Sequence, residues 1–98
     1  MSVSSVKISD LEFILDEKGV WDDNTAPRDV LNLPAEKRKT DGHWKRIENA
    51  NMSYPILIGP EGWIIDGIHR FCKAVVKGDT TIKAYKFTKE LMQSAIIK

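Results

Sequence analysis

Two short apolar runs separated by turn-forming residues are the clearest hydrophobic pattern in the chain. The runs YPILI and WIID, at residues 54–58 and 63–66, flank the sequence GPEG. Proline at the second position and glycine at the fourth are typical of a type I turn. The pattern predicts a β-hairpin with two buried strands, in which helices on one side and the hairpin edge on the other cover Trp63, Ile64 and Ile65.

A helical pattern follows the second run. Apolar residues recur at helical spacing, while basic residues share the opposite face. The apolar positions are Ile68, Phe71, Cys72 and Val75. Gly78 is a suitable residue for ending this helix. We therefore expect an amphipathic helix between Asp66 and Gly78, then a strand in TTIKAYKF and a terminal helix in TKELMQSAIIK.

The N-terminal segment ISDLEFILDEKG carries a second helical signal. Ser9 and Glu12 have the spacing of a capping box, and Gly19 supplies a stop, so we expect a short helix between them. The residues expected to pack this helix against the core are Leu11, Ile14 and Leu15.

The segment between these helices is less regular. Residues 21–39 mix turn formers with two prolines, which predicts a connection with one short ordered piece from Val30 to Leu33. In DGHWKRIENANM, Trp44 and Ile47 are three residues apart, as expected for a helix of two to three turns with one charged face.

Composition limits the chain to one compact domain over residues 1–98. The sequence is 42% hydrophobic and 30% charged, which suits a modest core and excludes extensive disorder. The net charge of +1 gives no general attraction to nucleic acid or an anionic membrane, so any anion site must be local. The chain has a single cysteine, no signal-peptide pattern and no apolar run as long as the ~20 residues that span a membrane. These features predict a cytoplasmic protein without membrane association.

The sequence DGIHR, between the second hairpin strand and the helix, concentrates positive potential. Gly67 lets the backbone turn sharply after Asp66, and His69 and Arg70 fall in the first helical turn. Unpaired N–H groups at a helix N-terminus carry roughly half a positive charge. Arg70 adds a charged fork suited to phosphate, and His69 adds a donor that titrates near neutral pH. Together these features predict a phosphate site.

A structural interpretation of the same sequence stays open. Asp66 is a suitable cap for the helix, Gly67 suits an unusual backbone angle, and Arg70 is a suitable ion-pair partner for Asp66. DGIHR also specifies fewer positions than a full phosphate-loop motif. Ligand chemistry and turn chemistry are therefore alternatives at this point.

Other candidate sites are weaker. Cys72 lies on the apolar stripe of its helix, which favours a buried inert thiol over a nucleophile. Two histidines and one cysteine far apart in the sequence lack zinc-ligand spacing, so we predict no metal site in the protein chain itself. His43 is able to approach His69 in space, although a surface or capping role is favoured. Acidic residues dilute the basic segment AEKRKTDGHWKR, which favours a solvated helix face over nucleic-acid contact.

Several of these segments together resemble the ParB/sulfiredoxin superfamily, in particular its small stand-alone members. The resemblance consists of an H-x-x-R-I-x-x-A helix, a Y-P-I strand and a D-G-x-H-R-x-x-K-A helix start, and it covers about half of the chain. The matching positions are His43, Arg46, Ile47, Ala50, Tyr54, Pro55, Ile56, Asp66, Gly67, His69, Arg70, Lys73 and Ala74.

The resemblance implies an α+β fold with a small mixed β-sheet flanked by helices. It also implies that the loop and helix start bind nucleotide phosphates, with ATP or ADP as the expected nucleotide and Mg²⁺ as a candidate ion. The binding residues that it implies are Gly67, Ile68, His69, Arg70 and Lys73. The candidate catalytic residues are Asp66, His69 and Arg70.

The sequence departs from the two best-known branches of the superfamily. Ile68 occupies the place of the reactive cysteine of sulfiredoxins, so their thiol chemistry has no nucleophile here. ParB proteins carry a glutamate-arginine-arginine motif at this point and add a helix-turn-helix domain, for which 98 residues leave no space.

The leading functional hypothesis is a nucleotide- or phosphate-binding domain that hydrolyses or transfers a phosphoryl group. In it, Arg70 and the amides after Asp66 hold phosphate, His69 donates to it, and Asp66 or Glu61 positions Mg²⁺ or an acceptor hydroxyl. The alternative is a non-enzymatic interaction module that uses the Trp44 helix or the terminal LMQSAIIK to bind a protein partner or a second copy. A nuclease ranks third, because the low net charge offers little contact area for nucleic acid.

Overall fold

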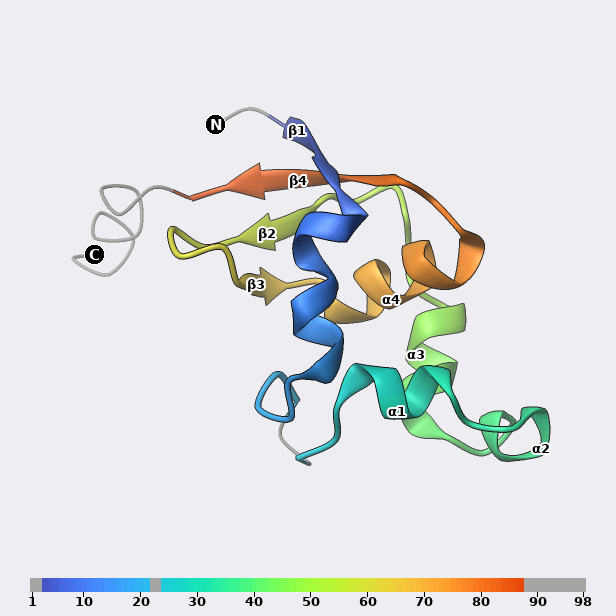
Figure 1. The fold of residues 1–98 in the computed structure, drawn as a ribbon. Coiled ribbons are helices and arrows are strands. Elements are labelled where there is room, and N and C mark those ends of the chain that lie inside the picture. The colour runs from blue at the N-terminus through green and yellow to red at the C-terminus, as the bar shows by residue number, and fades with distance from the viewer. Residues whose placement is uncertain (1–2, 22–23, 88–98) are drawn as a thin grey trace, which may run out of the picture.

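The computed structural model describes residues 3–21 and 24–87 of the chain. Within these residues, a small sheet is combined with short helices in an α+β fold (Figure 1). The elements are β1 (Val3–Lys7), the 3-10 helix η1 (Ile8–Asp16), α1 (Pro27–Leu31), α2 (Ala35–Arg38), α3 (Gly42–Glu48), β2 (Ile56–Ile58), β3 (Ile64–Asp66), α4 (Ile68–Lys77) and β4 (Thr81–Lys86).

The four strands form one mixed sheet in the order β1-β4-β2-β3. β2 and β3 are the predicted antiparallel hairpin, with the Gly62 N–H donating to the Gly59 carbonyl across its turn (3.1 Å). β4 runs parallel to β2 and antiparallel to β1. A parallel neighbour requires a crossover connection, and α4 provides it. The predicted small mixed sheet is therefore confirmed.

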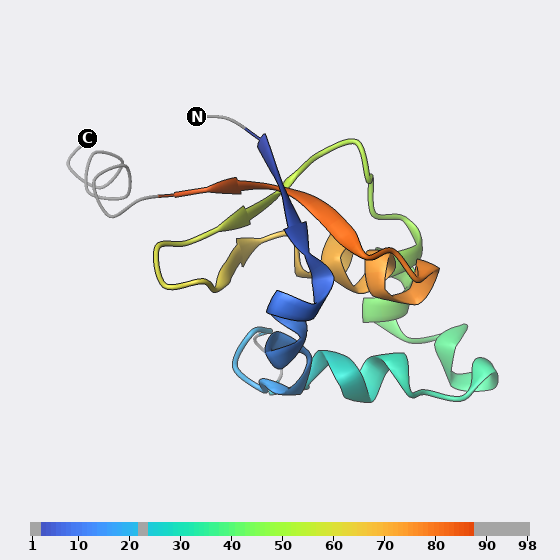
Figure 2. The ribbon, with the colours of Figure 1, turned by 45° about the horizontal axis from the view of Figure 1, so that its top comes forward.

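The helices η1, α1, α3 and α4 lie on one side of the sheet (Figures 1 and 2). Phe71 and Cys72 of α4 are fully buried, as is Ile56 of β2. Cys72 is thus the buried thiol that the sequence predicted. No helix in the described part of the chain is long and apolar enough to cross a membrane.

The prediction that both faces of the hairpin are covered is wrong. Ile64 is 8% exposed, whereas Trp63 and Ile65 are 41% and 48% exposed. The side chains alternate as a strand requires, but the helices named above cover one face only. In the described residues, the second face of β3 has no layer above it.

The N-terminal segment also differs from the prediction. Residues 3–7 form the edge strand β1, which the sequence analysis missed, and η1 is a 3-10 rather than an α-helix. Lys7 is its N-cap and forms no side-chain cap, so the capping box from Ser9 is not observed. The predicted packing residues Leu11, Ile14 and Leu15 are all buried.

Three helices connect this segment to the hairpin. The ordered piece expected from Val30 to Leu33 overlaps α1 only at Val30 and Leu31, because the helix begins earlier, at Pro27, a favoured first residue of a helix. After Pro34, the short helix α2 was not anticipated. The prediction of α3 is confirmed, and Asp41 caps it by accepting from the Trp44 amide (3.0 Å). The predicted terminal helix lies outside the described residues.

Candidate functional site

Gly67 brings the N-terminus of α4 against the sheet. Its φ angle is +101°, and a Cβ at this position would lie 2.8 Å from Cγ2 of Ile56. Both facts exclude an ordinary side chain. Gly67 is the N-cap of α4, and no side chain of residues 3–21 and 24–87 caps the helix. The capping role considered for Asp66 is therefore not observed.

His69, in the first turn of α4, meets His43 from the first turn of α3. Nε2 of His69 and Nδ1 of His43 are 3.0 Å apart, which is hydrogen-bonding distance. The surface or capping role favoured for His43 thus does not describe it fully. The fold brings the chain's two histidines, 26 residues apart in the sequence, into contact.

Trp21 stacks over both imidazole rings. Its ring centroid lies 3.7 Å from that of His43 and 5.0 Å from that of His69, at interplanar angles of 13° and 17°. Nε1 of Trp21 is buried and has no hydrogen-bond partner within the described part of the chain. An unsatisfied buried donor costs about 1–3 kcal/mol. Trp21, His43 and His69 form what we call the histidine stack.

The positive charge of Arg46 acts on the histidine stack. Burial lowers the pKa of His69, and the charges of His43 and Arg46 lower it further. His69 is therefore mostly uncharged at neutral pH in the free protein. Arg46 is exposed and lies one helical turn after His43 in α3. A negatively charged ligand at this place would offset the same charges that now oppose protonation of His69.

Arg70 and Lys73, two predicted phosphate contacts, bind backbone carbonyls. The Arg70 guanidinium donates to the Pro55 carbonyl (2.6 Å), and its Nη2 lies 3.5 Å from Oδ2 of Asp66. Nζ of Lys73 donates to the carbonyls of Glu48 (2.8 Å) and Ala50 (3.1 Å) at the end of α3. The Asp66–Arg70 pair, one of the open alternatives, is thus formed, and both cations hold the fold together.

The remaining predicted residues occupy different environments. The Ile68 side chain is buried at 8% exposure, which leaves only its backbone for a ligand. Asp66 is exposed at the end of β3, whereas Glu61 lies in the hairpin turn at the opposite end of that strand. Burial raises the pKa of Cys72 to about 12, so its thiol is neutral and unreactive. Among residues 3–21 and 24–87, no cluster of three potential metal ligands is found.

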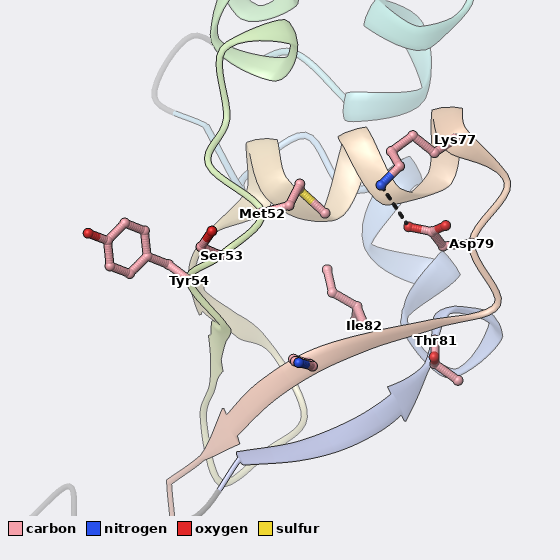
Figure 3. Close-up of a pocket in the computed structure, with 8 residues that line it drawn as sticks. Met52, Ser53, Tyr54, Lys77, Asp79, Thr81 and Ile82 are labelled. Atoms are coloured by element: carbon pink, nitrogen blue, oxygen red, sulfur yellow. Dashed lines mark ion pairs between the residues drawn. The ribbon is translucent and has the colours of Figure 1, made fainter.

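A pocket of about 240 Å³ lies at the other end of α4 (Figure 3). Lys77 and Asp79 form an ion pair on one side of it, with 3.6 Å between Nζ and Oδ2. Ile82 points into the space between β4 and α4, while Tyr54 points outward from the loop before β2. Lys83 also lines the pocket, and Asp79, the only carboxylate among the described residues that line it, is paired with Lys77.

The comparisons with known proteins identify no relative. No protein-family model matches the chain, and no curated protein and no solved structure shows significant similarity to it. The ParB/sulfiredoxin resemblance stays a hypothesis that depends on the motif positions alone.

The sequence analysis did not identify Trp21 as a site residue. It named Arg46 only as a position of the H-x-x-R-I-x-x-A motif and not as a ligand contact. Trp21 stands in a segment of turn formers without periodicity, so its sequence carries no signal of where it packs. The H-x-x-R spacing of His43 and Arg46 was a usable signal, because residues three apart share a helix face.

Proposed function

We propose that this chain binds a phosphate-bearing small molecule at the N-terminus of α4, with ATP or ADP as the first candidates. The observation that carries the proposal is the contact between His69 and His43, within reach of the charge of Arg46, beside a helix N-terminus that no side chain of the described residues caps. Backbone amides and cationic side chains at a helix N-terminus are suited to phosphate.

The roles of Arg46 and Arg70 differ from those expected from the sequence. The amides of the first turn of α4 hold the phosphate, His69 donates to it, and Arg46 supplies the compensating charge. Arg70 acts on the phosphate only through the electric field of its charge, because its guanidinium is held by hydrogen bonds to Pro55 and Asp66. The resemblance to the ParB/sulfiredoxin superfamily supports this placement, because its D-G-x-H-R motif falls at the same helix start.

Hydrolysis or transfer of a phosphoryl group is the reaction that this arrangement suits. Such reactions depend mainly on positioning and on neutralising charge. The exposed carboxylate of Asp66 adjoins the start of α4 and is the candidate for positioning Mg²⁺ or an acceptor hydroxyl. Glu61 is less suited, because the length of β3 separates it from the site.

A ligand screen tests the proposal. ATP, ADP, CTP, GTP and inorganic phosphate are titrated with and without Mg²⁺, by thermal shift and then calorimetry. Saturation at ~100 times Kd adds about 2.7 kcal/mol to the free energy of unfolding.

Matched variants locate the binding. His69→Ala and Arg46→Ala should each weaken binding roughly tenfold or more, because each removes a charge-assisted contact of about 1.5–3 kcal/mol. Lys45→Ala, which removes an exposed positive charge from the neighbouring position of α3, should leave Kd nearly unchanged. If none of the five compounds binds the parent, the proposal is wrong.

A second candidate function, an interaction module, is favoured by the uncovered face of the sheet. On that face, Val3 and Ile65 are 44% and 48% exposed. A separate exposed pair joins the Phe13 ring of η1 to the Trp63 ring next to β3, edge to face (5.2 Å). Exposed apolar groups of this kind are typical of interaction surfaces. The Trp44 helix is not such a surface, because Trp44 is 4% exposed and donates to the Val30 carbonyl.

A further inference from the structure

We infer that His43 and His69 act as one hydrogen-bonded unit that takes up a single proton when a phosphate dianion binds, and that Nδ1 of His69 donates to that ligand. The inference rests on the proposed function and adds its regulation by pH. His43 is then a positioning residue, because it acts on the ligand through His69.

The geometry fixes which nitrogen of His69 faces a ligand. Nε2 is engaged with Nδ1 of His43 at 3.0 Å. Within the described residues, Nδ1 of His69 has no hydrogen-bond partner, and the residue is half-buried at the start of α4. Because imidazole has only two ring nitrogens, Nδ1 is the atom left for the ligand.

The number of protons that the pair can hold follows from the same contact. Two neutral rings carry two protons, and one of these must lie between the facing nitrogens. A third proton goes to an outer nitrogen and leaves this hydrogen bond intact. A fourth would place two N–H groups face to face at 3.0 Å. The hydrogen bond between the rings is therefore compatible with one additional proton and is lost with a second.

The singly charged pair presents a donor to the ligand whichever ring carries the inner proton. If Nε2 of His69 carries it, the third proton goes to Nδ1 of His69. If Nδ1 of His43 carries it, Nδ1 of His69 is already protonated. In both cases His69 points an N–H outward, and the pair bears the charge that a phosphate dianion requires.

The charges around the pair explain why the proton arrives with the ligand. From α3, the charge of Arg46 is near enough to lower the pKa of His69, and Asp41 accepts a hydrogen bond from the Trp44 amide. At the start of α4, Arg70 and Asp66 are paired with each other. Lys73, one turn further along α4, donates hydrogen bonds to carbonyls of α3 and of the loop after it. Asp22 and Asp23 lie outside the described residues. A bound dianion offsets Arg46 and the helix N-terminus, and so favours protonation of His69.

Trp21 favours the charged form of the pair. Its ring lies parallel to both imidazoles, at 3.7 and 5.0 Å between centroids. A cation over an aromatic face is stabilised by the ring quadrupole, and the indole is the best such face. Trp21 also shields the hydrogen bond between the two histidines from water on that side.

The test measures proton uptake directly. Inorganic sulfate remains a dianion throughout the neutral range, so any proton taken up on its binding belongs to the protein. Calorimetric titrations with sulfate and with ATP in buffers of different ionisation enthalpy give the number of protons bound. We expect up to about one proton per sulfate near pH 7. The apparent Kd should rise by up to tenfold per pH unit over the range in which the complex keeps a proton that the free protein has lost.

Nitrogen-15 NMR of the imidazoles identifies the atom. On saturation with sulfate, Nδ1 of His69 should give the resonance of a protonated nitrogen, while Nε2 stays hydrogen-bonded to His43. His43→Asn should keep most of the affinity, because its amide oxygen accepts the Nε2 proton. His43→Leu should weaken sulfate binding about tenfold and flatten its pH dependence, as expected for loss of a charge-assisted contact.

The outcomes separate this inference from the proposed function. Sulfate or ATP that shifts the amides at the start of α4 without proton uptake overturns the inference and leaves the proposed function standing. Equal affinity and equal pH dependence in the parent and in His43→Leu overturn it as well, since His43 would then be structural only. If neither sulfate nor any of the five compounds of the ligand screen binds, the proposed function fails and the inference fails with it.

Discussion

Arg70 ties the two ends of the β-hairpin together. It donates to the Pro55 carbonyl just before β2 and pairs with Asp66 at the end of β3. The hydrogen bond to Pro55 is short and half-buried, while the carboxylate of Asp66 is 63% exposed. Exposed pairs contribute only about 0–1 kcal/mol, so the bond to the carbonyl is the stronger of the two contacts.

We predict that Arg70→Ala lowers the free energy of unfolding by about 1.5–3 kcal/mol, because it removes a charged donor from a backbone carbonyl. Asp66→Asn, the matched control, should change stability by less than about 1 kcal/mol. Urea unfolding of both variants measures the difference. Parent-like stability of Arg70→Ala would show that Arg70 serves the ligand alone.

Cys72 makes the stability of the fold depend on pH in alkaline solution. Burial raises the pKa of this thiol from 9.0 to about 12. Between these values the unfolded chain releases the proton and the folded chain keeps it, so stability falls as pH rises. We predict a loss of up to about 1.4 kcal/mol per pH unit in this window that is absent in Cys72→Ala. Identical alkaline slopes in the two proteins would contradict the burial of the thiol.

The element that determines the site is the turn between β3 and α4. Gly67→Ala would put a Cβ 2.8 Å from Ile56, at a φ of +101°. We predict a loss of about 2–4 kcal/mol, from backbone strain and from overpacking against a rigid β-branched side chain. Gly42→Ala is the control, because nothing lies within 4 Å of its Cβ and alanine is the better helix former. Equal melting temperatures for the two variants would contradict this account of the turn.

The sequence predicted those elements whose hydrophobic pattern is strong. The apolar stripe of α4 and the hairpin around GPEG both have a clear period, and both are observed. The strand β1, VSSVK, was missed because it is an edge strand with one buried residue, Val6. An edge strand of this kind has no alternation to detect.

The candidate site was only partly predictable, for a related reason. Gly67, His69 and Arg70 stand together in the sequence and were found there. The contact between His43 and His69 depends on how α3 packs on α4, and the position of Trp21 depends on a loop. Such contacts follow from tertiary packing, which local patterns do not encode. The same holds for Arg70, whose partner at Pro55 is 15 residues away.

At the scale of the whole molecule, the net charge is small, and positive charge matters only at particular places. The net charge is +1, and several cations are bound to backbone carbonyls or paired with acids. We predict that a 20-base-pair DNA duplex shows no binding by fluorescence anisotropy at micromolar protein in about 150 mM salt. Tight, salt-dependent binding would favour the nucleic-acid function that the sequence ranked third.

The most direct test of the central claim is amide NMR mapping of the best-binding nucleotide on the whole chain. We predict that the largest shifts fall on the amides of residues 67–70, with smaller ones at His43 and Arg46, and that they disappear in His69→Ala. Shifts centred on the pocket at the other end of α4, around Tyr54 and Lys77 (Figure 3), would contradict it, as would the absence of any shift at saturating nucleotide.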